Sequence, residues 1–356
     1  MDQWYQKDSM SVLEAKEEAQ RLAFAPIAFQ AALCLRDLGL LAALDAAGKE
    51  GLDLDELARR TGVARYGVGV LLDMGLSVRV VIQQDGVFHL SRLGHFVLHD
   101  SMARANMDFT ADICYRPMAH LAAAIRGGTP AGLVEFGDWP TVYHGLSQLP
   151  EQARRSWFAF DHYYSDRAFA ELLPRVFAGK PRRLVDIGAN TGRWALRCCA
   201  HDADVTLTLV DLPQQLAVAQ ANLTAAGHAE RIDLYPLDLL DPSQPLPGDG
   251  DVYWMSQFID CFSAKQIVDI LRRVRAAMPP AAVLYIVEVF PDRQRFESAA
   301  YTLNATSLYF TCVANGNSRF YRCDDLLALV REAGLEVVEQ VDGIGLGHSL
   351  LRLRPR

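Results

Sequence analysis

The stretch from Arg183 to Leu212 constrains the fold of this 356-residue chain more than any other segment. It begins with LVDIG, a short apolar run ending in glycine that predicts a buried strand. Gly188 and Gly192 then mark a tight turn, TGRWALRCCA has helical spacing, and a second apolar strand ends at Asp211. This order of elements is typical of the nucleotide-binding half of a doubly wound α/β sheet. There, the acid at the end of the second strand accepts hydrogen bonds from the ribose hydroxyls.

The residues of this turn favour S-adenosylmethionine over a dinucleotide. The turn reads G-A-N-T-G, closer to the G-x-G-x-G of methyltransferases than to the G-x-G-x-x-G of dinucleotide-binding proteins. Asp186 opens it, where a carboxylate attracts an amino-acid ammonium group and repels a pyrophosphate. Asp238 ends a third strand-like run, RIDLYPLD, where we expect an acid near an adenine. A Rossmann-like fold that binds no ligand is the alternative.

Length, charge and cysteine usage narrow the class of protein. The chain has room for two domains and a sizeable core. No apolar run is long enough to span a bilayer and the N-terminal segment is polar, so we expect a cytoplasmic protein without a membrane partner. The seven cysteines lack C-x-x-C spacing, which predicts reduced thiols and no metal site. A net charge of −8 disfavours a nucleic-acid partner.

Residues 1–105 have a winged-helix pattern. Two helices separated by Gly39 are followed by a helix-turn-helix and by RVVIQQDGVFHLS, a predicted hairpin with Asp85-Gly86 as its turn. A DNA-binding regulator is therefore an alternative. Its recognition helix, ARYGVGVLLDMG, offers Arg65 as its only cation, whereas base recognition needs several polar side chains. We therefore expect a dimerisation domain, in keeping with the apolar surface of the first helices.

Residues 106–178 are unusually rich in aromatic side chains and are predicted to form a helical link and substrate wall. Helical packing accounts for most of these residues, while a few are expected to stack on a flat aromatic substrate. The segment WFAFDHYYS supplies the candidates Phe160, His162, Tyr163 and Tyr164. No histidine pair in this link has H-x-x-x-H spacing, so it predicts no metal site.

Residues 179–356 continue as alternating strands and helices and end in two strands, EVVEQVDG and HSLLRLR. A β/α series closed by a strand pair matches the sheet of methyltransferases better than that of dehydrogenases. The predicted fold is therefore α/β, with an N-terminal, mainly helical winged-helix dimerisation domain and a C-terminal Rossmann-like class I methyltransferase domain.

Over nearly its whole length the chain resembles the plant-type small-molecule O-methyltransferases, which include caffeate and hydroxyindole O-methyltransferases and many bacterial relatives. VDIGANTG is similar to the family's VDVGGGTG, VDLP to its ribose-binding acid with Leu-Pro, and PLDLL to its adenine motif. The resemblance implies S-adenosyl-L-methionine as cofactor, a homodimer, and a small aromatic substrate, free or bound to a carrier. It places the cofactor positions at Gly188, Asp211, Leu212, Asp238, Leu239 and Ser256, to which the turn itself adds Asp186, Asn190 and Gly192.

The same resemblance implies the catalytic residues. The family has a catalytic histidine in a W-x-L-H-D-W segment, and alignment of the following helix, IVDILRR, places Asp260 of WMSQFIDCFS on it. Glu288 in YIVEVF falls on a family acid that braces the histidine, and Ser318 replaces another family acid. Asn190 replaces the middle glycine of the turn, which it tolerates because asparagine accepts positive φ better than most residues.

Methyl transfer from a sulfonium requires an electron-rich atom about 3 Å from the methyl carbon and, for a phenol of pKa near 10, a base. A carboxylate suits this role only if its pKa is raised. Burial among Trp254, Phe258 and Phe262, with Glu288 as a neighbouring like charge, is predicted to do so for Asp260.

The sequence leaves alternatives open for the chemistry. Loss of a phenolic proton activates the ring carbons as well as the oxygen, so C-methylation of an aromatic ring is the alternative to O-methylation. Asp260 can instead cap a loop, in which case His162 or His348 is the candidate base. A protein that binds the cofactor without catalysis is the remaining possibility.

Overall fold

The computed structural model describes residues 5–356, which form two compact units. The smaller unit extends to Thr110, and the larger unit runs from Ala111 to Arg356. The sequence divided the chain into three parts, at residues 105 and 178. The aromatic-rich segment, residues 111–178, belongs to the larger unit, where its helix α7 (Leu121–Gly127) contacts the π-helical turn Phe310–Ala314.

The smaller unit is mainly helical, with one hairpin. Its elements are α1 (Val12–Asp37), α2 (Leu40–Ala47), α3 (Leu54–Thr61), α4 (Arg65–Ser77), β1 (Val81–Gln84), β2 (Val87–Leu90), α5 (Arg92–His99) and α6 (Ser101–Phe109). Ser11 and Glu14 form a capping box that starts α1, Pro26 lies inside α1 without ending it, and Gly39 separates α1 from α2 at φ +80°. The predicted helix pair and its break are confirmed.

The predicted hairpin is also present. β1 and β2 pair antiparallel, with Gln84 opposite Val87. The turn residues Asp85 and Gly86 have φ of 48° and 85°, the left-handed conformations that a two-residue I′ turn requires. With α3 and α4, this hairpin completes the winged-helix pattern.

Within residues 5–356 no single helix is long and apolar enough to cross a membrane; α1 and α2 pass that test only as a pair, which is bent by 58°.

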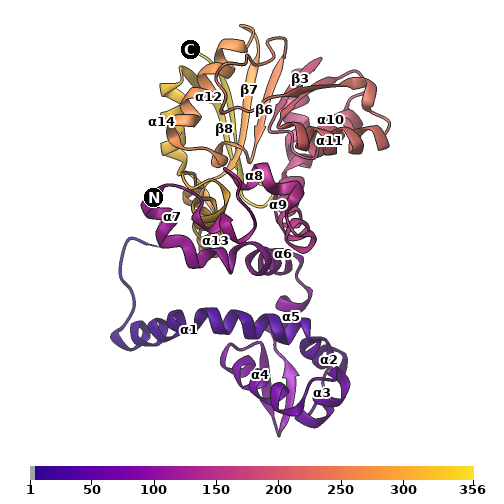
Figure 1. Ribbon diagram of the computed structural model, residues 1–356, viewed down its shortest axis with the longest axis vertical. Coiled ribbons are helices and arrows are strands. Elements are labelled where there is room, and N and C mark those ends of the chain that lie inside the picture. Colours follow the sequence, from indigo (N-terminus) through magenta and orange to yellow (C-terminus); the bar gives the residue numbers. More distant parts are fainter. Residues whose placement is uncertain (1–4) are drawn as a thin grey trace. The chain divides into compact units, whose positions relative to one another are not determined.

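The larger unit is built on a mixed seven-stranded sheet of order β5-β4-β3-β6-β7-β9-β8, in which only β9 runs antiparallel to its neighbours (Figure 1). Its strands are β3 (Arg183–Ile187), β4 (Thr206–Asp211), β5 (Ile232–Pro236), β6 (Val252–Ser256), β7 (Val283–Val289), β8 (Leu335–Ile344) and β9 (His348–Pro355). The terminal strand pair closes the parallel series, which confirms the predicted methyltransferase-like sheet.

Helices cover both faces of this sheet. The remaining helices of the unit are α8 (Val142–Gly145), α9 (Glu151–Phe177), α10 (Arg193–His201), α11 (Pro213–Ala225), α12 (Ala264–Ala277), α13 (Glu297–Tyr309) and α14 (Cys323–Glu332). The apolar sides of α12 and α14 pack on one face, and those of α9, α10 and α11 on the other (Figure 1). The predicted α/β class with a helical N-terminal unit is confirmed.

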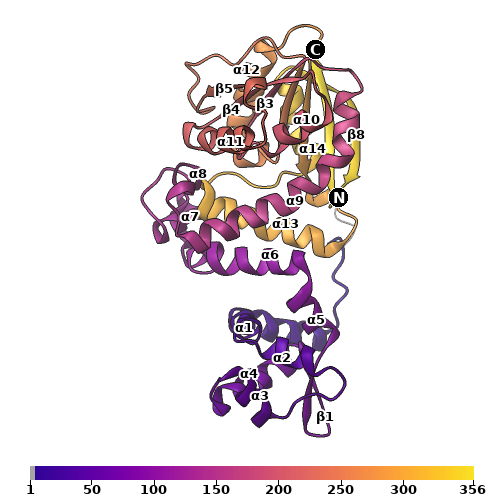
Figure 2. The same cartoon turned by 90° about the vertical axis from the view of Figure 1, so that its right-hand side faces the viewer.

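A helical layer adjoins the sheet of the larger unit. α13 lies beside α9 (Figure 2), and a buried hydrogen bond of 2.7 Å runs from the indole N–H of Trp157 to the hydroxyl of Tyr309. Because α9 begins in this layer and ends against the sheet, its middle turns reach the edge at which the parallel strands end.

Candidate active site

The carboxyl ends of five parallel strands meet on one edge of the sheet. In spatial order, Asp238 follows β5, Asp211 ends β4, Gly188 follows β3, Ser256 ends β6 and Glu288 lies near the end of β7. Ligands of open α/β sheets bind in the crevice outside this edge. The topology therefore brings residues from distant parts of the sequence to one place.

The turn after β3 has the backbone conformation that its sequence predicts. Gly188, Asn190 and Gly192 have φ of 81°, 50° and 78°, all in the left-handed region. A Cβ atom on Gly188 would lie 2.3 Å from the ring of Phe258, so only glycine fits there. Asn190 adopts positive φ as expected for the residue that replaces a glycine.

Asp211 is held in place by backbone hydrogen bonds. Its Oδ2 accepts from the N–H of Asn190 at 2.8 Å and its Oδ1 from the N–H of Leu212 at 2.7 Å. Burial raises the pKa of Asp211 to about 6, while these two bonds oppose the rise. Each carboxylate oxygen retains a lone pair that can accept from a hydroxyl.

The loop after β5 is tied to Asp211. The N–H of Leu237 donates to the backbone oxygen of Asp211 at 3.0 Å, and Asp238 accepts from the N–H of Leu240 at 2.9 Å. Leu239 is buried in the hydrophobic core on the α12 face of the sheet. The loop thus offers an acid and an apolar side chain next to the carboxylate at the end of β4.

Several buried oxygen atoms around this edge have no hydrogen-bond partner within the described residues. They belong to Asp186, Asn190, Gln257 and Glu288. Burial, and secondarily the charge of Asp211, raises the pKa of Asp186 to about 8. Since buried polar groups in proteins are nearly always hydrogen-bonded, these oxygens fit a ligand that brings its own donors, such as an ammonium group and hydroxyls.

Asp260 lies in the 3-10 turn Ile259–Cys261, between β6 and α12, and its position is fixed by Glu288. Oε1 of Glu288 accepts from the backbone N–H of Phe258 at 3.0 Å and of Ile259 at 2.9 Å. The carboxyl group at the end of β7 therefore holds the backbone that presents Asp260.

The other side of the same turn is held by the segment after α13. Asn315 donates from Nδ2 to the backbone oxygen of Cys261. The hydroxyl of Tyr321 donates to the backbone oxygen of Phe262 at 2.7 Å. Ser318, which replaces a family acid, donates to Asn315 Oδ1 at 2.9 Å. Its hydroxyl thus orients the amide that holds the Asp260 turn.

The environment of Asp260 favours its protonated form. Only 3% of the residue is exposed, and burial raises its pKa to about 7. The charge of Asp161 adds to this rise, and a hydrogen bond of 3.4 Å from the thiol of Cys261 opposes it. Burial and the charge of Asp260 raise the pKa of Glu288 well above its ordinary value, because two neighbouring buried carboxyls do not readily ionise together.

The prediction that Trp254 surrounds Asp260 is wrong. The Trp254 indole stacks on Trp194 at 4.0 Å between ring centroids and 8° between planes, within the core on the α10 face of the sheet. Successive side chains of a strand alternate between faces, and β6 directs Trp254 toward α10. Phe258 and Phe262 contact each other at 5.0 Å and pack toward the core on the α12 face.

Asp161 of α9 is a site residue that sequence reasoning missed. Its Oδ2 accepts from Nδ2 of Asn190 at 3.0 Å, and its charge raises the pKa of Asp260. Asp161 therefore lies between the turn after β3 (residues 188–192, hereafter the cofactor turn) and the turn that carries Asp260. Burial, followed by the charge of Asp166, raises its own pKa to about 7. The available signal was its identity as the only acid in WFAFDHYYS.

The aromatic candidates on α9 pack on one another. The ring of Tyr164 lies 5.2 Å from that of Phe160 and 5.4 Å from that of Tyr163, in T-shaped contacts. The guanidinium of Arg167 lies 4.3 Å above the ring of Tyr163. His162 instead lies 3.3 Å from the hydroxyl of Thr191 in the cofactor turn.

Both histidine candidates for the base are poor proton acceptors near neutral pH. Burial lowers the pKa of His162 to about 4, with the charge of Arg193 acting in the same direction. His348, the first residue of β9, is fully buried opposite Val289, and burial lowers its pKa to about 4. Asp260, with its pKa about 7, is the stronger base.

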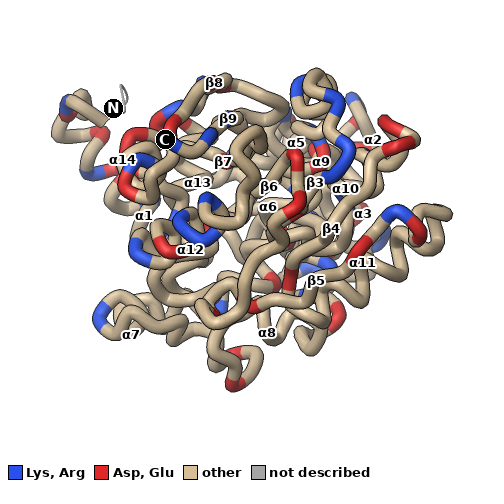
Figure 3. The backbone as a smooth tube through the Cα atoms, turned by 90° about the horizontal axis from the view of Figure 1, so that it is seen from above, with Lys and Arg blue, Asp and Glu red and all other residues tan. Residues whose placement is uncertain are grey.

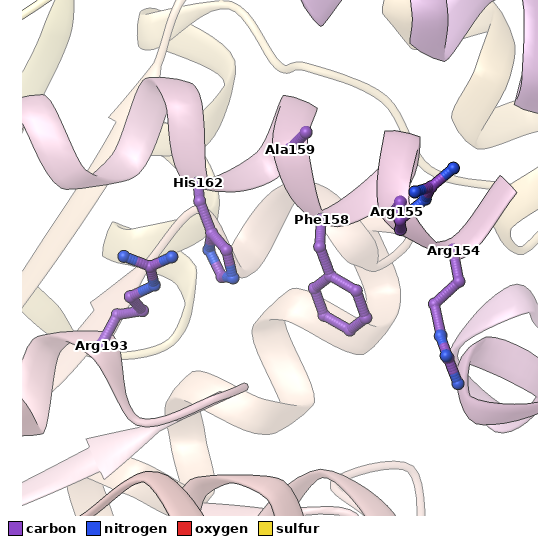
Figure 4. A pocket seen from close by; sticks show the side chains of 6 residues that line it. All are labelled: Arg154, Arg155, Phe158, Ala159, His162 and Arg193. Atoms are coloured by element: carbon purple, nitrogen blue, oxygen red, sulfur yellow. The ribbon is translucent and has the colours of Figure 1, made fainter. Parts of the chain in front are cut away.

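A cavity of about 340 Å³ opens beside the cofactor turn (Figure 4). It is lined by Arg154, Arg155, Phe158, Ala159, His162 and Arg193. Arg193 forms an ion pair with Asp166 at 2.8 Å, whereas Arg154 has no carboxylate partner among the described residues. The positive charge of this cavity suits an anionic group such as a carboxylate.

Two protein families match the chain, one in each unit. Residues 16–88 match the Dimerisation2-like domain, and residues 168–336 match the O-methyltransferase domain. The O-demethylpuromycin-O-methyltransferase of Streptomyces alboniger is 35% identical over 278 residues, which cover 76% of this chain and 71% of that protein. The chain is a member of the O-methyltransferase family.

Further comparisons agree with this assignment. The 3-amino-4-hydroxybenzoate 4-O-methyltransferase of Streptomyces cremeus is 27% identical over 86% of this chain and 82% of that protein. An O-methyltransferase from neocarzinostatin biosynthesis, solved with S-adenosylmethionine and 2-hydroxy-5-methyl naphthoic acid, shares the fold with a TM-score of 0.71. It is 20% identical and covers 98% of this chain and 100% of that one. The protein is an S-adenosylmethionine-dependent methyltransferase, as predicted.

The turn geometry of this methyltransferase leads to a first prediction. In Gly188→Ala, the new Cβ meets the Phe258 ring and the residue is forced into positive φ, so we expect the free energy of unfolding to fall by about 2 kcal/mol. Displacement of the turn should also weaken S-adenosylhomocysteine binding at least tenfold. Chemical denaturation and calorimetry measure the two effects.

The matched control is Gly179→Ala, because a Cβ on Gly179 meets nothing within 4 Å. Wild-type stability and affinity in Gly188→Ala would contradict the close approach of the Phe258 ring to the turn.

Proposed function

We propose that this methyltransferase transfers a methyl group from S-adenosylmethionine to a hydroxyl on a small aromatic molecule, with Asp260 as the general base. The observation that carries the proposal is a buried carboxyl of pKa about 7, held beside the cofactor turn by Glu288. Two of the relatives are named for O-methylation of an aminohydroxybenzoate and of O-demethylpuromycin. A small aromatic acceptor is consistent with both.

Residues along the sheet edge are assigned to the parts of the methyl donor. Asp211 accepts from the ribose hydroxyls, and Asp238 with Leu239 contacts the adenine. Asp186 faces the ammonium group, whose charge stabilises its ionised form. The donor lies against the backbone of Gly188, Asn190 and Gly192, with Leu212 and Ser256 beside it. The geometry of the β3 turn and of the Asp211 carboxylate supports this assignment.

The arginine-lined cavity is assigned to the carboxylate of the donor's methionyl part. Thr191 of the turn contacts His162 of the cavity, so the cavity adjoins the end of the turn that follows Asn190. Asp186 and the cavity thus offer opposite charges to the two charged groups of an amino acid. The charge of Arg154 supports this, because no carboxylate among the described residues neutralises it.

Asp260 removes the proton of the acceptor hydroxyl. S-adenosylmethionine, when bound, would supply an electrophilic methyl group for the oxygen and would keep the carbon–sulfur electron pair on sulfur as a neutral thioether, while the Asp260 carboxyl would hold the proton. A phenol of pKa near 10 loses its proton to a base of pKa about 7 at a cost of about 4 kcal/mol, against about 8 kcal/mol for an ordinary aspartate. Burial and the charge of Asp161, which raise the pKa of Asp260, thus lower the cost of the proton transfer.

Glu288 acts as a positioning residue. It touches the backbone of Phe258 and Ile259, and its unpaired Oε2 lies in the same buried region. Asp161 faces both Asn190 and the Asp260 region, and we assign it a contact with the acceptor. The aromatic residues of α9 provide the wall of the acceptor site.

The decisive variant is Asp260→Asn, which keeps size and hydrogen bonding but removes the proton acceptor. We expect turnover to fall by roughly 10²-fold or more, with S-adenosylhomocysteine affinity within a factor of two of wild type. Glu288→Gln keeps an acceptor oxygen for the two N–H groups and should cost less. Steady-state kinetics and calorimetry separate these effects.

The control is Asp269→Asn, on the exposed side of α12, which should leave turnover unchanged. Near-normal turnover in Asp260→Asn, together with an inactive His162→Ala, would overturn the assignment of the base.

We also propose that the protein is a homodimer formed through the smaller unit. α1 carries four apolar residues, each more than half exposed among residues 5–356: Leu13, Leu22, Phe24 and Ile27. Exposed apolar surface on a helix of a Dimerisation2-like domain fits a second copy of the same chain.

Light scattering at micromolar concentration should give twice the mass of one chain. Leu22→Glu, at a residue that is 77% exposed, should shift the protein toward monomer, because a charge is then buried at the interface. Val134→Glu in the larger unit, at a residue that is 67% exposed, is the matched control and should leave the mass unchanged. A monomeric wild-type chain would contradict the proposal.

A nucleic-acid partner is not proposed for the winged-helix pattern, nor is a membrane. Arg65, the only cation of α4, forms an ion pair with Asp55. Basic and acidic residues are interspersed along the chain (Figure 3), and the net charge is −8. A phosphate backbone requires a continuous basic surface, which this composition does not supply.

A further inference from the structure

A cluster of metal-binding groups lies in the smaller unit, outside every site discussed above. Asp45 of α2 faces His95 and His99 of α5, and one ligand atom from each lies within 4.8 Å of the others. Nε2 of His99 lies 2.9 Å from Asp45 Oδ2, and Nδ1 of His95 lies 3.8 Å from Asp45 Oδ1. All three residues are exposed, so the cluster is open to ions from solution.

The spacing of the two histidines explains their proximity. His95 and His99 are four residues apart on one helix, so their side chains share a face, and their ring centroids are 4.7 Å apart. This is the H-x-x-x-H spacing with which helices bind zinc. The sequence prediction of no metal site overlooked the pair, because it considered this spacing only in the aromatic-rich link.

The interatomic distances match a metal centre. Bonds of about 2.0–2.2 Å from zinc to nitrogen or oxygen, at tetrahedral angles, separate two ligand atoms by roughly 3.3 Å. The separations from His99 Nε2 to Asp45 Oδ2 and from His95 Nδ1 to Asp45 Oδ1 are 2.9 and 3.8 Å, and one ligand atom from each of the three residues lies within 4.8 Å of the others. The three side chains would therefore draw closer together, by rotation, to bind one ion.

We propose that Asp45, His95 and His99 bind one Zn²⁺ ion, with water completing the coordination. Two imidazoles and one carboxylate suit zinc, whereas Mg²⁺ and Ca²⁺ prefer oxygen ligands alone. The ion would link α2 to α5, two helices that otherwise contact each other through side chains of the same small core. The site therefore stabilises the unit to which we assign dimerisation, and it is independent of the methyl-transfer site.

The alternative is an ion pair between His99 and Asp45, with His95 nearby by chance. His120 and Glu135 of the larger unit form such a pair, at 3.0 Å, without a second histidine. This pair offers a matched comparison, because its histidine and carboxylate have similar exposure but cannot supply a third ligand among the described residues.

The test is calorimetric titration of the full chain, free of any polyhistidine tag, with ZnCl₂ in a non-chelating buffer that keeps the cysteines reduced. We expect one saturable site per chain with micromolar affinity. His95→Ala and His99→Ala should each weaken binding by roughly tenfold or more, and Asp45→Asn should also weaken it. His120→Ala should leave it unchanged, and MgCl₂ in excess should not compete.

A second readout uses folding, since an ion that binds only the native state raises the melting temperature, and the rise grows with the logarithm of the free ion concentration above its dissociation constant. Zinc should raise the melting temperature of wild type and of His120→Ala, and not that of His95→Ala or His99→Ala. No saturable binding to the wild-type chain, or equal binding to the His95→Ala and His99→Ala variants, would overturn the proposal. Asp45, His95 and His99 are exposed and His120 is half-buried, so the variants should fold, which circular dichroism checks.

Discussion

The burial of carboxyl groups at the carboxyl edge of the sheet is the constraint on which the rest of the site depends. Asp186, with only 2% of its surface exposed, has its pKa raised from 3.8 to about 8, which corresponds to a cost on the order of 6 kcal/mol for its ionised form. Asp161 and Asp260 share the same direction of shift. Each buried carboxyl matches a group that we assign to a ligand. Asp186 would face an ammonium group, and Asp260 would take the proton of a hydroxyl.

One set of backbone contacts connects the cofactor turn to the proposed base. Phe258 packs over Gly188, and its N–H donates to Glu288, which also holds Ile259 next to Asp260. A displacement of this short segment would therefore disturb both the turn and the base. Burial raises the pKa of the Asp260 carboxyl to about 7, near that of an ordinary imidazole, which fits the role of general base that we propose for it.

The parts of the site that are local in sequence could be predicted, and the parts that depend on tertiary contacts could not. The β3 turn, the acid at the end of β4 and the Asp85-Gly86 hairpin follow from short-range patterns. Asp161 was missed because its role arises from contacts with Asn190 and Asp260, which are distant in the chain. The placement of Trp254 was wrong because the sequence does not say which face of β6 it occupies.

We infer that Asp260 is a buried carboxyl that ionises near neutral pH, and its ionisation can be measured without any substrate. Carbon-13 NMR of the aspartate carboxyls, recorded from pH 4 to 9 on wild type and on Asp260→Asn, isolates the Asp260 resonance by difference. We expect a carboxyl that titrates at a pH of about 7 in the wild type and is missing from the variant. A missing resonance that titrates instead near pH 4 would show an ordinary aspartate, and the proposed base would be contradicted.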